Sequence, residues 1–300
     1  MKKPAFDPIV KMKSFKADLD QSLKAGLEKM RIDPESIHEI HNSFRRVAGQ
    51  LDFPFPDMKE IHDFIISKEN LEIPVRLFVP LNAKPSEGPC LIYFHGGGFV
   101  TGSIESHEGI TRRIAFNTGI RVLSVNYRLA PKFPYPAALN DCEAVLDWAL
   151  NNSNCRKWGI NSNNISLGGD SAGGNITAYL SQKFRDRVKA QILFYPLMQL
   201  IDFKPPKPGP QDWLQLGFMA LKFIDEHYVA GANTQKTSLS PLLEDNLKGL
   251  PPSYILTCGL DPLRDEGKLY ADKLLVNAIN VDYNHEKLLP HGFLNFTRLF

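Results

Sequence analysis

Short, uninterrupted apolar runs alternate along the chain with longer stretches of helical character. The runs lie at Cys90–Phe94, Val122–Val125, Ile165–Leu167, Ile192–Tyr195 and Tyr254–Cys258, with a last one near Val281–Tyr283. The helix-like stretches lie around Glu108–Asn117, Ala138–Asn151, Ala172–Arg185 and Pro262–Ala278. Continuous apolarity is typical of strands that are buried on both faces of a parallel sheet. The pattern therefore predicts an α/β fold, with a mostly parallel sheet between two layers of helices.

One segment before these runs has a different pattern. From Ile73 to Val79, apolar residues alternate with others, as in a strand that has one exposed face. Ile61–Ser67 is the expected hairpin partner, although its own alternation is less regular. Because Pro74 has no amide hydrogen to donate, the sequence predicts that its strand lies at the edge of the sheet.

Residues 1–50 do not fit the alternation of strands and helices. Apolar residues recur there at helical spacing, with lysines on the other face. They are Met12, Phe15, Leu19, Leu23, Leu27 and Met30. We interpret this segment as helical and packed on the protein body, rather than as a helix that lies on a membrane surface.

The long gap between Tyr195 and Tyr254 is the second exception. It holds a proline-rich loop at Pro205–Pro210 and an amphipathic stretch at Trp213–Tyr228. Lids and substrate pockets of α/β enzymes are built at the carboxyl edge of the sheet, where this gap begins. We therefore expect an insertion that covers a binding site.

Composition narrows the class of protein. The 300 residues are 43% hydrophobic, enough for one large α/β domain, and the net charge of +2 favours neither nucleic acid nor a strongly acidic partner. None of the four cysteines forms a C-x-x-C pair, so we expect no disulfide framework and a reducing interior. No segment has the length of a membrane span, and no apolar stretch follows the basic N-terminus. The sequence thus predicts a soluble, cytoplasmic protein.

Gly169–Gly173 is the first candidate for chemistry. It reads G-D-S-A-G, follows an apolar run and precedes a helix-like stretch. In that context a G-x-S-x-G sequence predicts a sharp strand-to-helix turn that presents a serine hydroxyl, because the glycines allow the two backbones to approach closely. Ser171 is thus the candidate nucleophile. The alternative is an ordinary helix N-cap.

A serine nucleophile needs a general base and a carboxylate that orients the base. In α/β-hydrolases these follow the serine in the order acid, then histidine. Asp261 lies just after the run that ends at Cys258, and His291 lies after the last predicted strand. Asp265 is the rival acid, but Asp261 is nearer to the strand end. Asp261 could also be only the N-cap of the next helix.

The other histidines are weaker candidates for the base. His38 and His41 form an H-x-x-H without further ligands nearby, so we expect solvated helix residues rather than a metal site. His62, His107 and His227 are expected at surface or packing positions, and His285 falls too early, within or just after the strand. A structural role in hydrogen bonding is expected for His95.

His95–Phe99 reads H-G-G-G-F directly after the Cys90–Phe94 run. Three consecutive glycines leave backbone N–H groups free to approach a reacting carbonyl. The sequence therefore predicts an oxyanion hole here, and with the serine, the acid and the histidine four separate elements indicate one mechanism.

These motifs resemble the hormone-sensitive-lipase-like branch of the α/β-hydrolases, the bacterial family IV carboxylesterases. The matching segments are His95–Phe99, Tyr127–Pro131, Gly169–Gly174, Asp261–Gly267 and His291–Phe293. The resemblance implies an eight-stranded, mostly parallel sheet with a helical cap, a triad of Ser171, Asp261 and His291, and an oxyanion hole from the amides of Gly97, Gly98 and Ala172. It implies an N-terminal cap segment at 1–50 and a catalytic domain at 51–300 with a cap insertion at about 201–232.

Two positions depart from the family pattern. Lys132 stands where the family usually has glutamate, for which we expect a structural rather than a catalytic consequence. The chain stops at Phe300, nine residues after His291, where the family normally continues into a helix that covers one face of the sheet. Two alternatives follow: the sequence is truncated after Phe300, or this apolar face of the sheet is covered by something else, such as the second subunit of a homodimer.

The sequence predicts a carboxylesterase that hydrolyses short- to medium-chain acyl esters without a metal or other cofactor. The alternatives are a deacetylase or amidase with the same triad, a lipase for long acyl chains, and a non-catalytic small-molecule receptor on the same fold. The presence of His291 in its motif argues against the receptor.

Overall fold

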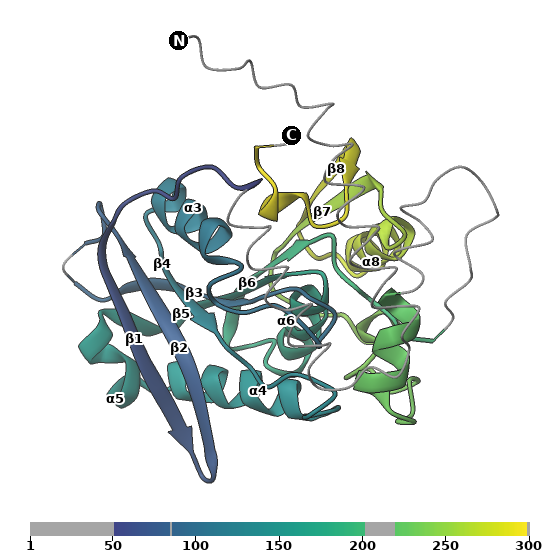
Figure 1. Cartoon of the computed structure of the whole chain (residues 1–300), viewed down its shortest axis with the longest axis horizontal. Coiled ribbons are helices and arrows are strands. Elements are labelled where there is room, and N and C mark those ends of the chain that lie inside the picture. The colour runs from purple at the N-terminus through teal and green to yellow at the C-terminus, as the bar shows by residue number, and fades with distance from the viewer. Residues whose placement is uncertain (1–50, 85, 202–219, 299–300) are drawn as a thin grey trace, which may run out of the picture.

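A computed structural model gives the structure of this protein, and it describes residues 51–84, 86–201 and 220–298. The predicted N-terminal cap segment, 1–50, and residues 202–219 of the predicted cap insertion lie outside the described residues. The described body is a three-layer α/β arrangement with an eight-stranded sheet at its centre (Figure 1).

The sheet has the order β1-β2-β4-β3-β5-β6-β7-β8. Its strands are β1 (Met58–Lys68), β2 (Leu71–Pro80), β3 (Gly88–Phe94), β4 (Arg121–Val125), β5 (Ile160–Asp170), β6 (Val188–Phe194), β7 (Ser253–Leu260) and β8 (Val281–Pro290). β2 pairs antiparallel with β1 and β4, and all the other pairs are parallel. The prediction of a mostly parallel sheet with an antiparallel hairpin at its start is confirmed.

The prediction that Pro74 marks an edge strand is wrong. β2 lies between β1 and β4, and β1 is the edge strand. Pro74 is tolerated because the β2–β4 ladder does not reach it. The last pair of this ladder is Val75↔Val125, and Val75 is the residue that follows Pro74. The Pro74 carbonyl oxygen accepts a hydrogen bond from the Asn126 amide (3.0 Å), so the missing Pro74 N–H would also have pointed past the end of β4.

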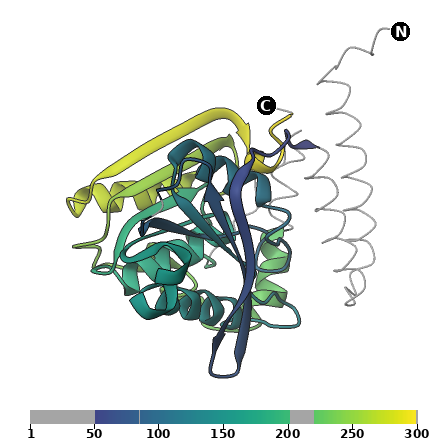
Figure 2. The same cartoon turned by 90° about the vertical axis from the view of Figure 1, so that its left-hand side faces the viewer.

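Helices cover both faces of the sheet, as the alternation of side chains along the strands requires. They are α3 (Glu108–Thr118) on one face, and α4 (Ala137–Ala149), α6 (Ala172–Lys183) and α8 (Arg264–Val276) on the other (Figures 1 and 2). Along β3, Leu91 and Tyr93 pack in the cluster that contains α3, whereas Cys90, Ile92 and Phe94 pack in the cluster of the opposite face. All four cysteines are buried and free, so they act as small apolar residues of the core.

Short elements complete the described chain: α5 (Asn152–Cys155), η1 (Arg156–Trp158), the π-helical turn η2 (Asp225–Val229), η3 (Pro241–Leu243) and η4 (Phe293–Asn295). Within residues 51–84, 86–201 and 220–298, no helix combines the length and the apolarity that a membrane crossing needs.

The first and last described segments are fastened to each other. The Arg298 amide donates to the Leu51 carbonyl oxygen (2.9 Å), and the Phe53 amide donates to Oγ1 of Thr297 (3.1 Å). The buried Asp52 accepts hydrogen bonds from Thr297 and from Arg113 of α3. Arg113 also donates to the Leu294 carbonyl oxygen (3.3 Å), so this strap holds the segment that follows His291.

Candidate active site

Ser171 lies at a sharp turn between β5 and α6. Its backbone has a φ of 53° and a ψ of −116°, a conformation that non-glycine residues adopt only when their surroundings impose it. The surroundings here are the backbone around β6: the Ser171 amide donates to the Phe194 carbonyl oxygen (2.9 Å), and the Ser171 carbonyl oxygen accepts from the Leu197 amide (3.1 Å). The strained turn therefore presents the hydroxyl beyond the carboxyl ends of the central strands.

The glycines around Ser171 are required by close approach of the backbone. A Cβ atom on Gly173 would overlap the carbonyl oxygen of Phe94, and one on Gly169 would overlap the carbonyl group of Gly173. Both obstacles are main-chain atoms, which cannot rotate away as a side chain can. The turn thus depends on glycine at both positions, as the sequence pattern predicts.

The structure brings Ser171, His291 and Asp261 together at the carboxyl end of the sheet. Nε2 of His291 lies 2.9 Å from Oγ of Ser171, and Nδ1 of His291 lies 2.8 Å from Oδ2 of Asp261. Asp261 follows β7 and is buried, while the His291 side chain, which follows β8, is 32% exposed. A base that contacts both a serine and an orienting carboxylate can take up the hydroxyl proton.

The acid is Asp261 in this arrangement and not its rival. Asp265 lies in the first turn of α8, its side chain is 83% exposed, and its carboxylate accepts a hydrogen bond from Arg264. Oδ1 of Asp261 also accepts from the Leu263 amide (2.8 Å). The carboxylate therefore caps the chain before α8 and orients the histidine at the same time.

The remaining described histidines lie elsewhere, as expected. His62 contacts Glu60 on the edge strand, and His227 packs on Phe223. His285 lies within β8, and its Nδ1 is 3.0 Å from the hydroxyl of Thr257 on the neighbouring strand β7. His38 and His41 lie outside the described residues. His107 is buried, as a packing role requires, but it contacts polar groups.

The surroundings of His291 tune its basicity. Partial burial by itself would lower its pKa, but the negative charge of Asp261, the hydrogen bond to Asp261 and the more distant charge of Asp170 together raise it above its ordinary value. The Tyr195 ring meets the imidazole edge-on, with 4.9 Å between the ring centroids. The imidazole is thus held by a carboxylate at one nitrogen and by an aromatic ring at its side.

The glycine loop after β3 folds into a tight turn beside Ser171. Gly97 and Gly98 have φ values of 112° and 63°, and the Gly97 carbonyl oxygen accepts from the amides of Val100 (3.1 Å) and Thr101 (2.9 Å). The Tyr127 hydroxyl donates to the His95 carbonyl oxygen (2.6 Å), and its ring stacks on His95. His95 thus has the structural role that the sequence predicts.

The described part of the predicted cap insertion packs directly on this loop. Residues 220–224 are helical and continue into η2. The Ile224 side chain lies 2.9 Å from the place that a Cβ atom on Gly98 would take, and the Tyr228 ring stacks on Phe99 at 3.9 Å between centroids. A second chain segment therefore packs against the predicted oxyanion loop.

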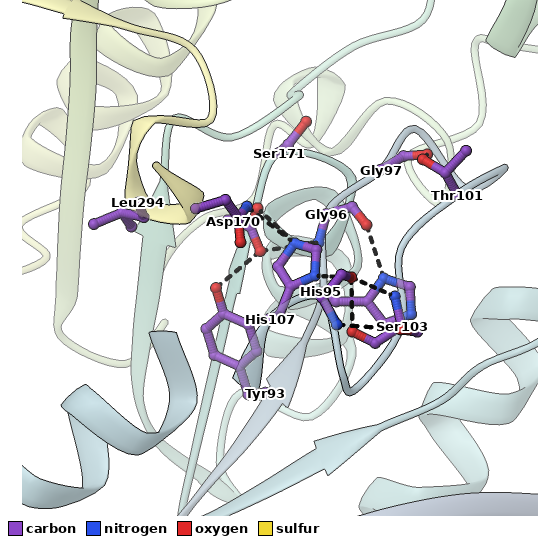
Figure 3. A network of polar contacts seen from close by, with 12 residues as sticks. Tyr93, His95, Gly96, Gly97, Thr101, Ser103, His107, Asp170, Ser171 and Leu294 are labelled. Atoms are coloured by element: carbon purple, nitrogen blue, oxygen red, sulfur yellow. Dashed lines mark hydrogen bonds and ion pairs between the residues drawn. The ribbon is translucent and has the colours of Figure 1, made fainter. Parts of the chain in front are cut away.

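Two acidic residues near the site were not predicted. Asp170, next to Ser171, is buried and contacts Tyr93, Gly96 and His107 (Figure 3). Its signal in the sequence is a carboxylate directly before the candidate nucleophile, at the end of a strand. Glu266 in the first turn of α8 reads as a surface charge in the sequence, but its Oε1 accepts from the Met198 amide (2.6 Å). Burial raises the pKa of Glu266 to about 8, and the charge of Asp261 adds to this.

Lys132 has no role at the site. It is exposed, and its ammonium group lies 5.2 Å from the centre of the Phe133 ring. The neighbouring ion pair is Arg128 with the buried Asp141 (2.7 Å), which holds the loop before α4 without Lys132. The described part of the chain holds no group of three or more His, Cys, Asp or Glu side chains placed to bind a metal ion.

Known proteins are similar to this chain in sequence and in fold. The model of a family described as having the α/β hydrolase fold matches residues 91–295. The carboxylesterase NlhH of Mycobacterium tuberculosis is 32% identical over 98% of this chain and 90% of its own length, and arylacetamide deacetylase of Bos taurus is 28% identical over 84% and 79%. Among solved structures, EstE1, a thermostable carboxylesterase from a metagenomic library, matches with a TM-score of 0.77 and 30% identity, over 91% of this chain and 93% of EstE1.

Proposed function

Since the chain belongs to the hormone-sensitive-lipase-like branch of the α/β-hydrolase family, we propose that it hydrolyses carboxylic esters with Ser171 as the nucleophile, His291 as the general base and Asp261 as the orienting acid. The observation that carries the proposal is the continuous chain of contacts from Asp261 through His291 to Ser171, with distances of 2.8 and 2.9 Å. The names of the relatives, which include carboxylesterases, support the reaction class.

The reaction follows from the roles of these groups. Nε2 of His291 takes the proton of the Ser171 hydroxyl as the oxygen attacks the ester carbonyl carbon. The tetrahedral intermediate collapses, the bond to the alcohol oxygen breaks, and the protonated His291 gives its proton to the departing alcohol. Water, deprotonated by His291 in turn, attacks the acyl carbon of the acyl-serine. The bond between this carbon and Oγ of Ser171 then breaks, His291 returns the proton to Oγ, and the carboxylic acid leaves.

The oxyanion of the tetrahedral intermediate needs hydrogen-bond donors. We assign this role to the amides of Gly97, Gly98 and Ala172. The positive φ of Gly97 and Gly98 turns the loop backbone at the site, and Ala172 is the first residue of α6, where backbone N–H groups are free of partners within the helix. The packing of Ile224 against Gly98 supports a pocket that is closed on one side, which favours short- to medium-chain acyl groups.

A panel of aryl esters with acyl chains of increasing length, from acetyl to palmitoyl, tests the proposal. Ser171→Ala removes the nucleophile and should lower kcat by about four orders of magnitude or more, because a triad loses nearly all its advantage when one member is missing. Ser67→Ala, at an exposed position of β1, is the matched control and should retain wild-type activity. An unchanged rate in Ser171→Ala would contradict the mechanism.

The same panel separates the substrate classes. Activity that falls steeply beyond medium chains supports the esterase, whereas a preference for the longest chains would favour a lipase. Aryl amides belong in the panel because one relative is named as an arylacetamide deacetylase, and faster turnover of amides than of esters would favour that alternative. A non-catalytic receptor would turn over none of these compounds. A cytoplasmic location stays a prediction.

A further inference from the structure

Three pieces of the proposed machinery meet at one buried histidine. Nε2 of His107 lies 3.2 Å from the Gly96 amide nitrogen of the glycine loop and 3.4 Å from Oδ2 of Asp170, the residue before Ser171. It also lies 3.5 Å from Nδ2 of Asn295 in η4, the turn after His291. Figure 3 shows how Asp170 and His107 face each other beneath the loop, with the Ser171 side chain pointing the other way.

The carboxylate of Asp170 is the acceptor that serves this cluster. Its Oδ1 accepts hydrogen bonds from the Tyr93 hydroxyl (2.8 Å) and from the Gly96 amide (2.9 Å). Asp170 is 2% exposed and His107 is 1% exposed, so water does not compete for these contacts. A Cβ atom on Gly96 would overlap Oδ2 of Asp170, which means that the carboxylate packs against the loop backbone itself. The position of the carboxylate therefore fixes the start of the glycine loop.

His107 is itself fixed from its other side. The Ser106 hydroxyl lies 2.8 Å from its Nδ1, and the Ser103 amide donates to the same hydroxyl (2.9 Å). These contacts attach the cluster to the chain that leads into α3. The cluster thus connects β3, the glycine loop, the start of α3 and the end of β5, and it reaches η4 through Asn295.

The charge on Asp170 has a second consequence. Burial by itself would raise the pKa of Asp170, but the contacts with His107 and Tyr93 outweigh burial and hold its pKa below the ordinary value. His95 and Tyr195 also face this carboxylate. Asp261 and Tyr195 contact His291, and the charge of Asp170 acts together with that of Asp261 to favour the protonated imidazole, which raises the pKa of His291.

We propose that Asp170 is a positioning residue, which accepts a hydrogen bond from the Gly96 amide and so holds the oxyanion loop in register with Ser171. This inference rests on the proposed ester hydrolysis. It assigns Asp170 no contact with the substrate. The position of the loop depends on the acceptor oxygen of Asp170, whereas the effect on the pKa of His291 depends on its charge, so the two can be tested separately.

Two substitutions separate them. Asp170→Ala removes the acceptor of the Gly96 amide, so the loop loses its register, and kcat should fall by about tenfold to a hundredfold with a smaller change in KM. Asp170→Asn keeps an acceptor oxygen for Gly96 and Tyr93 but removes the charge. It should shift the acid limb of the pH profile of kcat/KM to lower pH, because His291 then loses its proton more readily. In the wild type this limb should lie above the ordinary pKa of histidine.

The concentration of protein with a reactive serine is measured by titration with an aryl phosphonate, and kcat is calculated from that concentration. Misfolded protein then does not lower the measured kcat. Asp186→Asn, at an exposed loop position, is the matched control and should behave as the wild type. Tyr93→Phe removes only the hydroxyl that donates to Asp170. If Asp170→Ala gives no protein with a titratable serine, this milder variant replaces it, and its kcat per serine should fall by less than is expected for Asp170→Ala.

A purely structural role for Asp170 predicts a different result. The variants would then contain a smaller fraction of protein that reacts with the phosphonate, but kcat per reactive serine would stay within twofold of the wild type. The pH profile of Asp170→Asn would superimpose on that of the wild type. That result would overturn the inference and leave the proposed function standing. A wild-type protein that neither reacts with the phosphonate nor hydrolyses any ester would overturn both.

Discussion

Replacement of Glu266 by glutamine should change how the stability of the protein depends on pH. The pKa of Glu266 is raised from 4.5 to about 8, because the side chain is buried against the backbone at Met198. Between these two values the folded protein holds a proton that the unfolded chain releases. The free energy of unfolding therefore falls as pH rises through this window, by up to about 1.4 kcal/mol per pH unit.

Glu266→Gln removes this titration while keeping an oxygen that can accept from the Met198 amide. Between pH 5 and pH 8, the free energy of unfolding of the variant should rise relative to that of the wild type by at most about 4 kcal/mol. The gain should be small at pH 5 and largest at pH 8. Urea unfolding of both proteins at pH 5, 6, 7 and 8 measures the difference.

The matched control is Glu72→Gln, at an exposed position of β2. Its stability relative to the wild type should not vary with pH in the same window. A difference between Glu266→Gln and the wild type that stays flat from pH 5 to pH 8 would refute the reasoning, because it would mean that Glu266 titrates alike in the folded and unfolded states.

Two further predictions concern the serine turn and the assembly. Gly173→Ala should destabilise the fold by about 3 kcal/mol or more, because its Cβ atom would overlap the Phe94 carbonyl oxygen. Gly231→Ala, with a φ of 82° but nothing within 4 Å of the added Cβ atom, should cost only about 1 kcal/mol. Urea unfolding at neutral pH compares the two variants, and equal losses of stability would contradict the steric argument. The homodimer stays a prediction, supported by the half-buried side chains of Ile192, Phe194 and Tyr254, and light scattering of a dilute solution that shows only monomer would contradict it.

The sheet could be predicted because each central strand is a continuous apolar run. Ile92 and Leu123 need no information from distant residues to be assigned to buried strands. The place of β2 was predicted wrongly from Pro74, because the number of residues that β4 pairs with β2 is set by tertiary structure. A proline in the sequence shows only that one N–H is missing from the strand. Whether that N–H would have paired with a neighbour depends on where the neighbouring strand ends.

The proposed triad could be predicted for a similar reason. Ser171, Asp261 and His291 each follow a strand, and the carboxyl ends of parallel strands meet at one edge. The cluster around His107 could not be predicted, because its members lie up to 188 positions apart, and the two motifs that contain Gly96 and Asp170 give no sign of a contact with His107. Glu266 was missed since its helix reads as amphipathic, and only the fold reveals that Met198 lies opposite it.

The strap between the first and last described segments affects when the protein acquires its activity. Leu51–Phe53 are made early, but the residues that fasten to them, up to Arg298, are about 244 positions later in the chain. Synthesis proceeds from the N-terminus, and contacts between such distant positions are slow to form. The turn after His291 is therefore secured only after residue 298 has been made. We therefore expect a nascent chain that already carries Ser171 and the glycine loop to become active only after synthesis has passed that point.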